Sequence, residues 1–228
     1  MPETDLSMTD EEREELELVT KDNDALCSLC EELNGRRRRR RQFAAHVIHM
    51  LVQQNGPEEL IEYLPILIDA LDVDRVKEAQ TRWEILDTLT LMVDVAERGL
   101  DNAFDGAADA LFDESSTSLR YAAFNYLCTW GAVTKNRANK VWPLIDEAIQ
   151  CYHGNAEYHD MLASLLVYAE GKIDGKIAQE LIERLEFDAD NIHVTYLKTR
   201  SCEIRDYLMK RFKIDAAHKA KNLTQKDE

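Results

Sequence analysis

Residues 141–152 read VWPLIDEAIQCY, a stretch whose apolar residues repeat with the period of an α-helix. The apolar positions are Val141, Leu144, Ile145, Ala148, Ile149 and Tyr152. Steps of three and four residues place these side chains along one face of a helix, because an α-helix turns once in about 3.6 residues. Residues 60–71 and 85–96 show the same spacing. The pattern therefore predicts amphipathic helices that bury one side.

The same periodicity runs through most of the chain and predicts a succession of helices. The expected ranges are 10–20, 24–34, 37–54, 57–71, 76–98, 101–112, 117–133, 138–152, 155–170, 174–186 and 190–212. Pro57 suits the first turn of its helix, since a missing N–H has no cost there. Ser115 or Ser116 is expected to cap the helix over 117–133.

Composition supports an all-α fold. The chain has 228 residues, of which 45% are hydrophobic and 32% are charged, so it can bury a core and is not disordered throughout. It contains only 8 Gly and 4 Pro, too few for the many turns of a β-sandwich or barrel.

Short sequence matches recur with a period of about 40 residues, a length typical of helical repeats. The sequence Asp-Ala-Leu at 69–71 returns one such period later at 109–111. Arg41, Arg82 and Arg120 each stand near the start of a predicted helix, and one period separates each from the next. Pro65 and Pro143 lie in similar apolar stretches that are two periods apart. Such a period indicates an array of similar units.

With these features the chain resembles the HEAT-repeat family. That family has about 40 residues in each helix–turn–helix unit, with a Pro in the first helix, an Asp in the turn and an Arg early in the second helix. The matching positions here are Pro65, Pro143, Asp113, Arg82 and Arg120.

The resemblance covers roughly residues 24–210, and the later units depart from the motif. The fourth unit has Tyr158 where an Arg is expected, and the fifth has no clear Pro or Arg. The resemblance implies a right-handed α-α superhelix, a HEAT/armadillo-like solenoid of about five helix pairs. Such arrays bind their partners on a concave face.

Charge and periodicity predict three segments. Residues 1–23 are expected to form an acidic N-terminal arm or capping helix, 24–212 the α-solenoid, and 213–228 a charged flexible tail. End units of a repeat array need a polar outer face, which the acidic helix and the tail would supply.

The formal net charge is −16, so the surface on average repels nucleic acid and anionic membranes. No apolar stretch is long enough for a membrane span, and no apolar leader is seen at the start of this sequence. There are five Cys, an odd number. These features predict a reduced protein of the cytoplasm that does not enter a membrane.

A run of six arginines is the most unusual local feature. It consists of Arg36, Arg37, Arg38, Arg39, Arg40 and Arg41. We expect it to bind an anionic partner, either protein or nucleic acid, or else to neutralise the acidic N-terminal segment. Arg82 and Arg120 are further candidates for partner binding, with a role inside the repeat as the alternative.

Two cysteines and two histidines have spacing close to that of a zinc site. Cys27 and Cys30 are followed by His46 and His49, and these four residues offer the ligands of a tetrahedral zinc. All four lie in apolar helical stripes, where they are more often packing residues. We therefore predict neither a metal nor a cofactor, and leave the metal as the alternative.

No phosphate loop, dinucleotide fingerprint, nucleophile elbow or metalloprotease motif occurs. The sequence therefore predicts a non-enzymatic adaptor, scaffold or assembly factor that binds another protein on the concave face. One alternative is a nucleic-acid-binding HEAT-like protein related to alkylated-base repair glycosylases, with Trp83, Tyr121, Trp130 and Trp142 lining a groove. The other is an accessory protein of the chromophore-lyase type.

Overall fold

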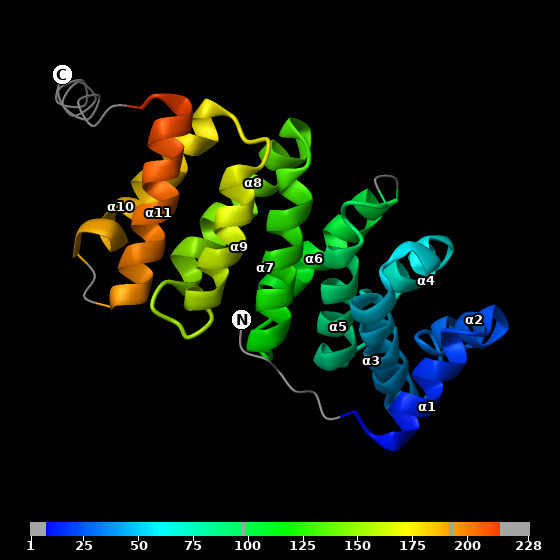
Figure 1. The fold of residues 1–228 in the computed structure, drawn as a ribbon. Coiled ribbons are helices and arrows are strands. Elements are labelled where there is room, and N and C mark those ends of the chain that lie inside the picture. The colour runs from blue at the N-terminus through cyan, green and yellow to red at the C-terminus, as the bar shows by residue number, and fades with distance from the viewer. Residues whose placement is uncertain (1–7, 97–98, 192–193, 215–228) are drawn as a thin grey trace. The chain divides into compact units, whose positions relative to one another are not determined.

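The structure, a computed structural model, describes residues 8–96, 99–191 and 194–214. Every regular element in this part of the chain is a helix (Figure 1). The expected all-helical class is therefore confirmed. The chain divides into two compact units, residues 1–126 and 127–228, with the boundary inside α7 (Thr117–Ala132).

Unit 1 contains the following elements in chain order: α1 (Asp10–Val19), α2 (Asn23–Glu32), α3 (Arg38–Asn55), the 3-10 helix η1 (Glu58–Tyr63), α4 (Leu64–Asp69), α5 (Ala79–Leu91), the 3-10 helix η2 (Leu100–Ala103), α6 (Phe104–Leu111) and most of α7. Helices α3 and α5 lie side by side, and α1 packs on both α2 and α3 (Figure 1). The helix expected over 10–20 corresponds to α1.

Unit 2 contains the end of α7, α8 (Lys135–Tyr152), α9 (Tyr158–Glu170), α10 (Gly175–Asn191) and α11 (Thr195–Phe212). Helix α10 packs along α11, and α9 contacts both α8 and α11. The stretch VWPLIDEAIQCY lies in α8, where Val141, Ile145 and Ala148 are each 0% exposed. Pro143 lies inside this helix, which continues to Tyr152.

The segment predicted as one helix over 57–71 is built from two elements. The chain runs as the 3-10 helix η1 and then as α4. Pro65 lies in the first turn of α4, where its missing N–H leaves no hydrogen bond unmade. The stripe remains apolar across the junction because Leu60 and Leu67 are both buried.

Two other predicted helices are wrong in extent. The helix expected over 76–98 is shorter, since α5 covers only Ala79–Leu91. Met92 and Val93 follow in a turn and are buried as well, so the apolar pattern extends beyond the helix. The helix expected over 190–212 begins at Thr195, because α10 continues to Asn191.

Ser116 stands immediately before α7, and its hydroxyl accepts a hydrogen bond from the N–H of Leu119 at 3.2 Å, as expected of a cap. The predicted tail at 213–228 lies outside the described residues except for Lys213 and Ile214. Among the helices of the described ranges, none combines the length and apolar character needed to cross a bilayer.

Candidate functional site

The arginine run lies at the start of α3 in unit 1. Arg36 and Arg37 belong to the turn after α2, Arg37 is the N-cap residue, and the remaining four open the helix. No side chain caps this helix end, and its first turn holds no acidic residue. The run therefore adds positive charge where the helix dipole is already positive, which destabilises the helix.

Two of the six arginines are held by the protein itself. Arg40 donates to both carboxylate oxygens of Glu32, at 2.8 and 2.9 Å. This hydrogen bonding raises the pKa of Arg40. Arg41 forms an ion pair with Glu78 at 2.7 Å and donates to the carbonyl of Gly35, also at 2.7 Å. These two arginines join α3 to α2 and to the start of α5.

The other four, Arg36, Arg37, Arg38 and Arg39, are exposed. None of them makes a hydrogen bond or ion pair with the residues that the structure describes, although Arg38 lies near enough to Glu78 to contribute to lowering its pKa. These four residues are called the arginine turn below. It presents four uncommitted guanidinium groups to solvent.

Arg82 and Arg120 serve turns of the fold. The side chain of Arg82 is buried, its Nε donates to the Leu71 carbonyl at 3.1 Å, and it lies 3.7 Å from Asp113. Burial lowers the pKa of Arg82. Arg120 donates to the Asp113 carbonyl at 2.9 Å. The contacts of both residues fit the alternative role inside the repeat, and Arg82 at 2% exposure offers little to a partner.

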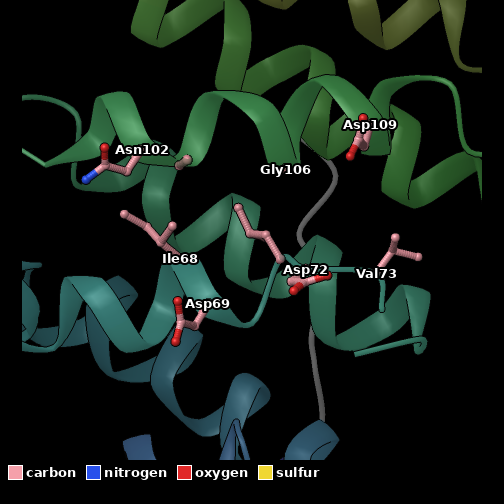
Figure 2. A pocket seen from close by; sticks show the side chains of 9 residues that line it. Ile68, Asp69, Asp72, Val73, Asn102, Gly106 and Asp109 are labelled. Carbon is pink, nitrogen blue, oxygen red and sulfur yellow. The ribbon is translucent and has the colours of Figure 1, made fainter. Parts of the chain in front are cut away.

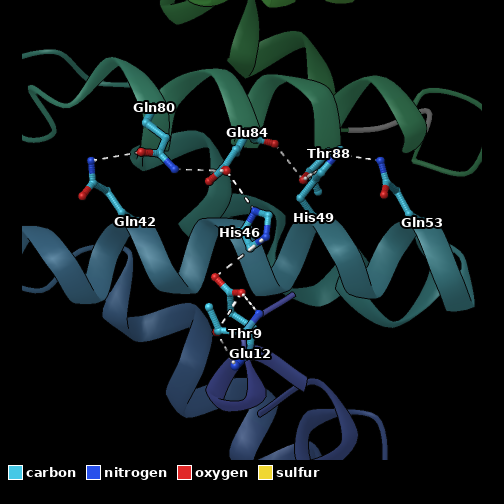
Figure 3. Close-up of polar contacts among 9 residues, drawn as sticks. All are labelled: Thr9, Glu12, Gln42, His46, His49, Gln53, Gln80, Glu84 and Thr88. Carbon is cyan, nitrogen blue, oxygen red and sulfur yellow. Dashed lines mark hydrogen bonds and ion pairs between the residues drawn. The ribbon is translucent and has the colours of Figure 1, made fainter. Parts of the chain in front are cut away.

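A ladder of polar contacts joins α3 to α5 (Figure 3). Its contacts are Gln42 Nε2 to Gln80 Oε1 at 3.4 Å, His46 Nδ1 to Glu84 Oε1 at 3.0 Å and His49 Nδ1 to Thr88 Oγ1 at 3.4 Å. The steps of three and four residues along α3 keep these side chains on one face. The ladder therefore fixes the register of the two helices.

His49 is built into the ladder as a neutral group. The Thr88 hydroxyl donates to the Glu84 carbonyl at 2.9 Å, so its oxygen is left to accept from His49 Nδ1. Gln53 Nε2 lies 2.8 Å from His49 Nε2, which then acts as acceptor. Burial, with the nearby His46, lowers the pKa of His49 to about 4.

His46 has the opposite environment, because carboxylates lie on both sides of its ring. Glu84 is at 3.0 Å from Nδ1, and Glu12 of α1 is at 3.9 Å from Nε2 (Figure 3). The hydrogen bond with Glu84 raises the pKa of His46, against the effect of burial. His46 therefore favours its protonated form, which links α1, α3 and α5.

Two acidic residues of α5 lie in or near this ladder. Glu84 is 1% exposed, and its Oε2 has no hydrogen-bond partner among the described residues. One turn further along α5, burial raises the pKa of Asp87 to about 7, with a smaller contribution from Glu84. An acid held neutral by burial can change charge close to neutral pH.

The proposed zinc ligands do not come together. Within the described ranges, no group of three or more His, Cys, Asp or Glu residues is arranged to hold a metal. Cys30 is buried in α2, where burial raises the pKa of its thiol to about 12, and both histidines contact α5 instead. Sequence reasoning treated these histidines as packing residues or ligands and missed the ladder, whose partners follow 38 or 39 residues later.

A hollow of about 270 Å³ lies between α4 and η2–α6 (Figure 2). Asp69, Asp72 and Asp109 line it, together with Asn102 and the apolar Ile68. Asp69 is engaged by Arg75 at 2.8 Å. The lining is acidic, so this surface has the opposite charge to the arginine turn.

The aromatic residues considered for a nucleic-acid groove are largely internal. Trp130 is 1% exposed and Trp142 is 8% exposed. Trp142 donates its indole N–H to Glu180 at 2.5 Å and stacks on Tyr168. Trp83 and Tyr121 are only partly exposed. These contacts are those of packing residues.

No protein-family model matches the chain, and no curated protein matches it. Several solved structures have a similar fold. Two of them are crystal structures of engineered proteins from the Northeast Structural Genomics Consortium. The first has a TM-score of 0.67 at 14% identity and covers 87% of this chain and 90% of that one. The second has a TM-score of 0.64 at 10% identity, with coverages of 87% and 89%. At such identities the likeness shows the fold alone.

Proposed function

We propose that the chain is a HEAT-like right-handed solenoid of about five helix pairs. Contacts at a near-constant separation along the chain support this in unit 1. The α3–α5 ladder joins residues 38 and 39 positions apart at His46–Glu84 and His49–Thr88. In a stack of similar units, equivalent positions of neighbouring units touch, so contacts recur at the repeat length.

Unit 2 supports the same proposal independently. Trp142 of α8 bonds to Glu180 of α10, and Asp146 of α8 bonds to Arg184, and each pair is separated by 38 residues. Here the contacts join the first helices of two proposed pairs, whereas in unit 1 they join the second helices. Each unit thus contains contacts at the separation that the proposed repeat requires.

We propose that this scaffold is a non-enzymatic adaptor that binds an acidic segment of another protein through the arginine turn. The observation that carries the proposal is that Arg36, Arg37, Arg38 and Arg39 are exposed and form no hydrogen bond or ion pair with the described residues, in a chain with 44 acidic and 28 basic side chains. Residues that break a local rule of stability mark functional positions. In a HEAT-like array, α3 would be a second helix and would contribute to the concave face.

Carboxylates are the chemistry that suits this turn. A guanidinium group binds a carboxylate through two parallel hydrogen bonds, and Arg40 and Glu32 show that geometry within the chain. Nucleic acid also carries anions, but a protein with a net charge of −16 repels its dense phosphate array. An acidic protein segment carries fewer charges and can approach the turn locally, because salt screens repulsion from charges more than about 10 Å away.

Capture from native lysate tests this function. The tagged chain is compared with a variant in which Arg36–Arg39 are changed to Gln, with and without nuclease. The control replaces four exposed lysines of unit 2 by Gln, namely Lys135, Lys172, Lys176 and Lys198.

A stoichiometric, nuclease-resistant protein is expected with the unaltered chain and the lysine control, and not with the arginine variant. Loss of all partners on nuclease treatment would show that the arginine turn binds nucleic acid rather than protein. Equal recovery of the partner protein by the arginine variant would show that the arginine turn is not part of the interface.

A further inference from the structure

Helix α1 is a short element held on the surface of unit 1. It spans ten residues, Asp10–Val19, and buries only Leu16 and Val19. Leu18 on the same helix is 49% exposed. A helix of this length is not stable alone, so its order depends on the contacts that it makes with α2 and α3.

A charged contact connects α1 to the interior of unit 1. Glu12 accepts hydrogen bonds from the backbone and hydroxyl of Thr9, at 2.7 and 2.9 Å, and so caps α1. Its other oxygen faces His46 Nε2 at 3.9 Å, and the far side of the same ring meets Glu84. A proton on His46 therefore lies between one carboxylate on α1 and one on α5.

We propose that α1 is a releasable latch, closed while His46 is protonated between Glu12 and Glu84 and opening when His46 becomes neutral. Without that proton, Glu12 and Glu84 face each other across a neutral ring. Water screens Glu84 little, because this residue is only 1% exposed. Repulsion between the two carboxylates then acts on α1, which is held by the burial of only Leu16 and Val19.

The direction of the pH response follows from the groups around the ring. The raised pKa of His46 means that its stabilisation of the closed state is complete below about pH 6.5 and is lost as pH rises through the raised value. Each unit by which the closed state raises the pKa of His46 corresponds to about a tenfold shift in the equilibrium between closed and open α1.

Among the neighbouring titratable groups, His46 is the one whose protonation is proposed to control α1. Burial raises the pKa of Glu12, but the hydrogen bonds from Thr9 and the charge of His46 outweigh it, so Glu12 is ionised throughout the range near neutrality. His49, with its pKa of about 4, is neutral there. Asp87 gains charge near pH 7, but the charges that raise the pKa of His46 are those of Glu84 and Glu12. Arg40 of α3 also forms an ion pair with Glu11 of α1 at 3.8 Å.

Hydrogen exchange of residues 10–19 between about pH 5.5 and about pH 8.5, corrected for intrinsic exchange, tests the latch. The opening equilibrium of α1 is expected to rise across this range in the unaltered protein and to stay flat in His46→Gln. His159→Gln, which changes an exposed histidine of unit 2, should respond like the unaltered protein. A flat profile in the unaltered protein, or an unchanged rise in His46→Gln, would overturn the proposal.

Titration of the His46 ring by NMR keeps the test decisive if His46→Gln does not fold. Glu12→Gln removes the charge but keeps the cap, because Gln serves equally at that position of a capping box. It should lower the pKa of His46. An identical pKa for His46 in the two proteins would show that α1 is not coupled to its proton.

Discussion

At the residue scale, Arg82 is a buried residue that stabilises the fold through its contacts. Its replacement by Ala removes a buried guanidinium group from the Leu71 carbonyl and from the half-buried Asp113. We expect a loss of about 2–4 kcal/mol in the free energy of unfolding, measured by denaturant titration. Arg75→Ala is the matched control, since Arg75 pairs with Asp69 on the surface and should cost less than about 1 kcal/mol. Equal losses in the two variants would show that the buried contacts of Arg82 do not stabilise the fold more than a surface ion pair does.

Asp87 gives a second prediction at this scale. Its raised pKa means that the folded state favours the neutral acid, so this stability is complete below about pH 4 and is lost as pH rises through about 7. Asp87→Asn should therefore stabilise the protein by about 1–2 kcal/mol at about pH 8, and the gain should shrink toward about pH 5.

Thermal unfolding measured across this pH range checks the effect of Asp87. Asp94→Asn is the control, because Asp94 is an exposed aspartate just beyond the same helix. A gain that does not depend on pH, or an equal gain in Asp94→Asn, would contradict the account.

The partners of single residues mark the limit of prediction from sequence. The arginine run is visible as six consecutive letters, but the sequence does not show that two of the side chains pair with described carboxylates and four do not. Arg40 is engaged by Glu32, 8 residues earlier, and Arg41 by Glu78, 37 residues later. Only the packing of α2, α3 and α5 brings these carboxylates to the run. The role of His46 was hidden for the same reason.

At the element scale, helix positions follow from the apolar stripe, whereas helix ends do not. The expected range 138–152 overlaps α8 closely, since the stripe there coincides with the helix. The ranges 57–71 and 76–98 failed because residues in a 3-10 turn or an ordinary turn are buried as well. Burial produces the pattern in both cases, so periodicity alone does not separate them.

Gly171 allows a close approach between elements of unit 2. It ends α9, and a Cβ at this position would overlap the backbone of Ala132 at the end of α7. The same contact includes a hydrogen bond from the Lys172 N–H to the Ala132 carbonyl at 2.8 Å. Gly171→Ala should therefore destabilise the protein by about 2 kcal/mol.

Gly175→Ala is the control for this overlap. Its added Cβ would meet Phe212 at an ordinary 3.8 Å, and it lies at the start of α10, where Ala favours helix. This variant should be neutral or slightly stabilising in the same unfolding measurement. A cost for Gly175→Ala as large as that for Gly171→Ala would point to glycine flexibility rather than close approach.

At the scale of the whole molecule, the proposed function depends on how charge is distributed over the surface. The net charge of −16 keeps most of the surface repulsive to anions, and the arginine turn is a local exception. The all-helical class follows from composition and periodicity. Repeat contacts at 38 residues within each unit support the solenoid proposal, although degenerate motifs such as Tyr158 leave the later units weakly marked in sequence.

The most direct test of the central claim is the affinity of the captured partner as a function of salt, from about 50 mM to about 500 mM NaCl. Exposed charge pairs contribute about 0.2–1 kcal/mol each, so changing all four residues Arg36–Arg39 to Gln should weaken binding on the order of tenfold at low salt. The difference should narrow as salt rises, and the variant with four lysines replaced should bind within about twofold of the unaltered chain. Equal affinity of the arginine variant, or an equal loss in the lysine variant, would contradict the claim that the arginine turn is the binding site.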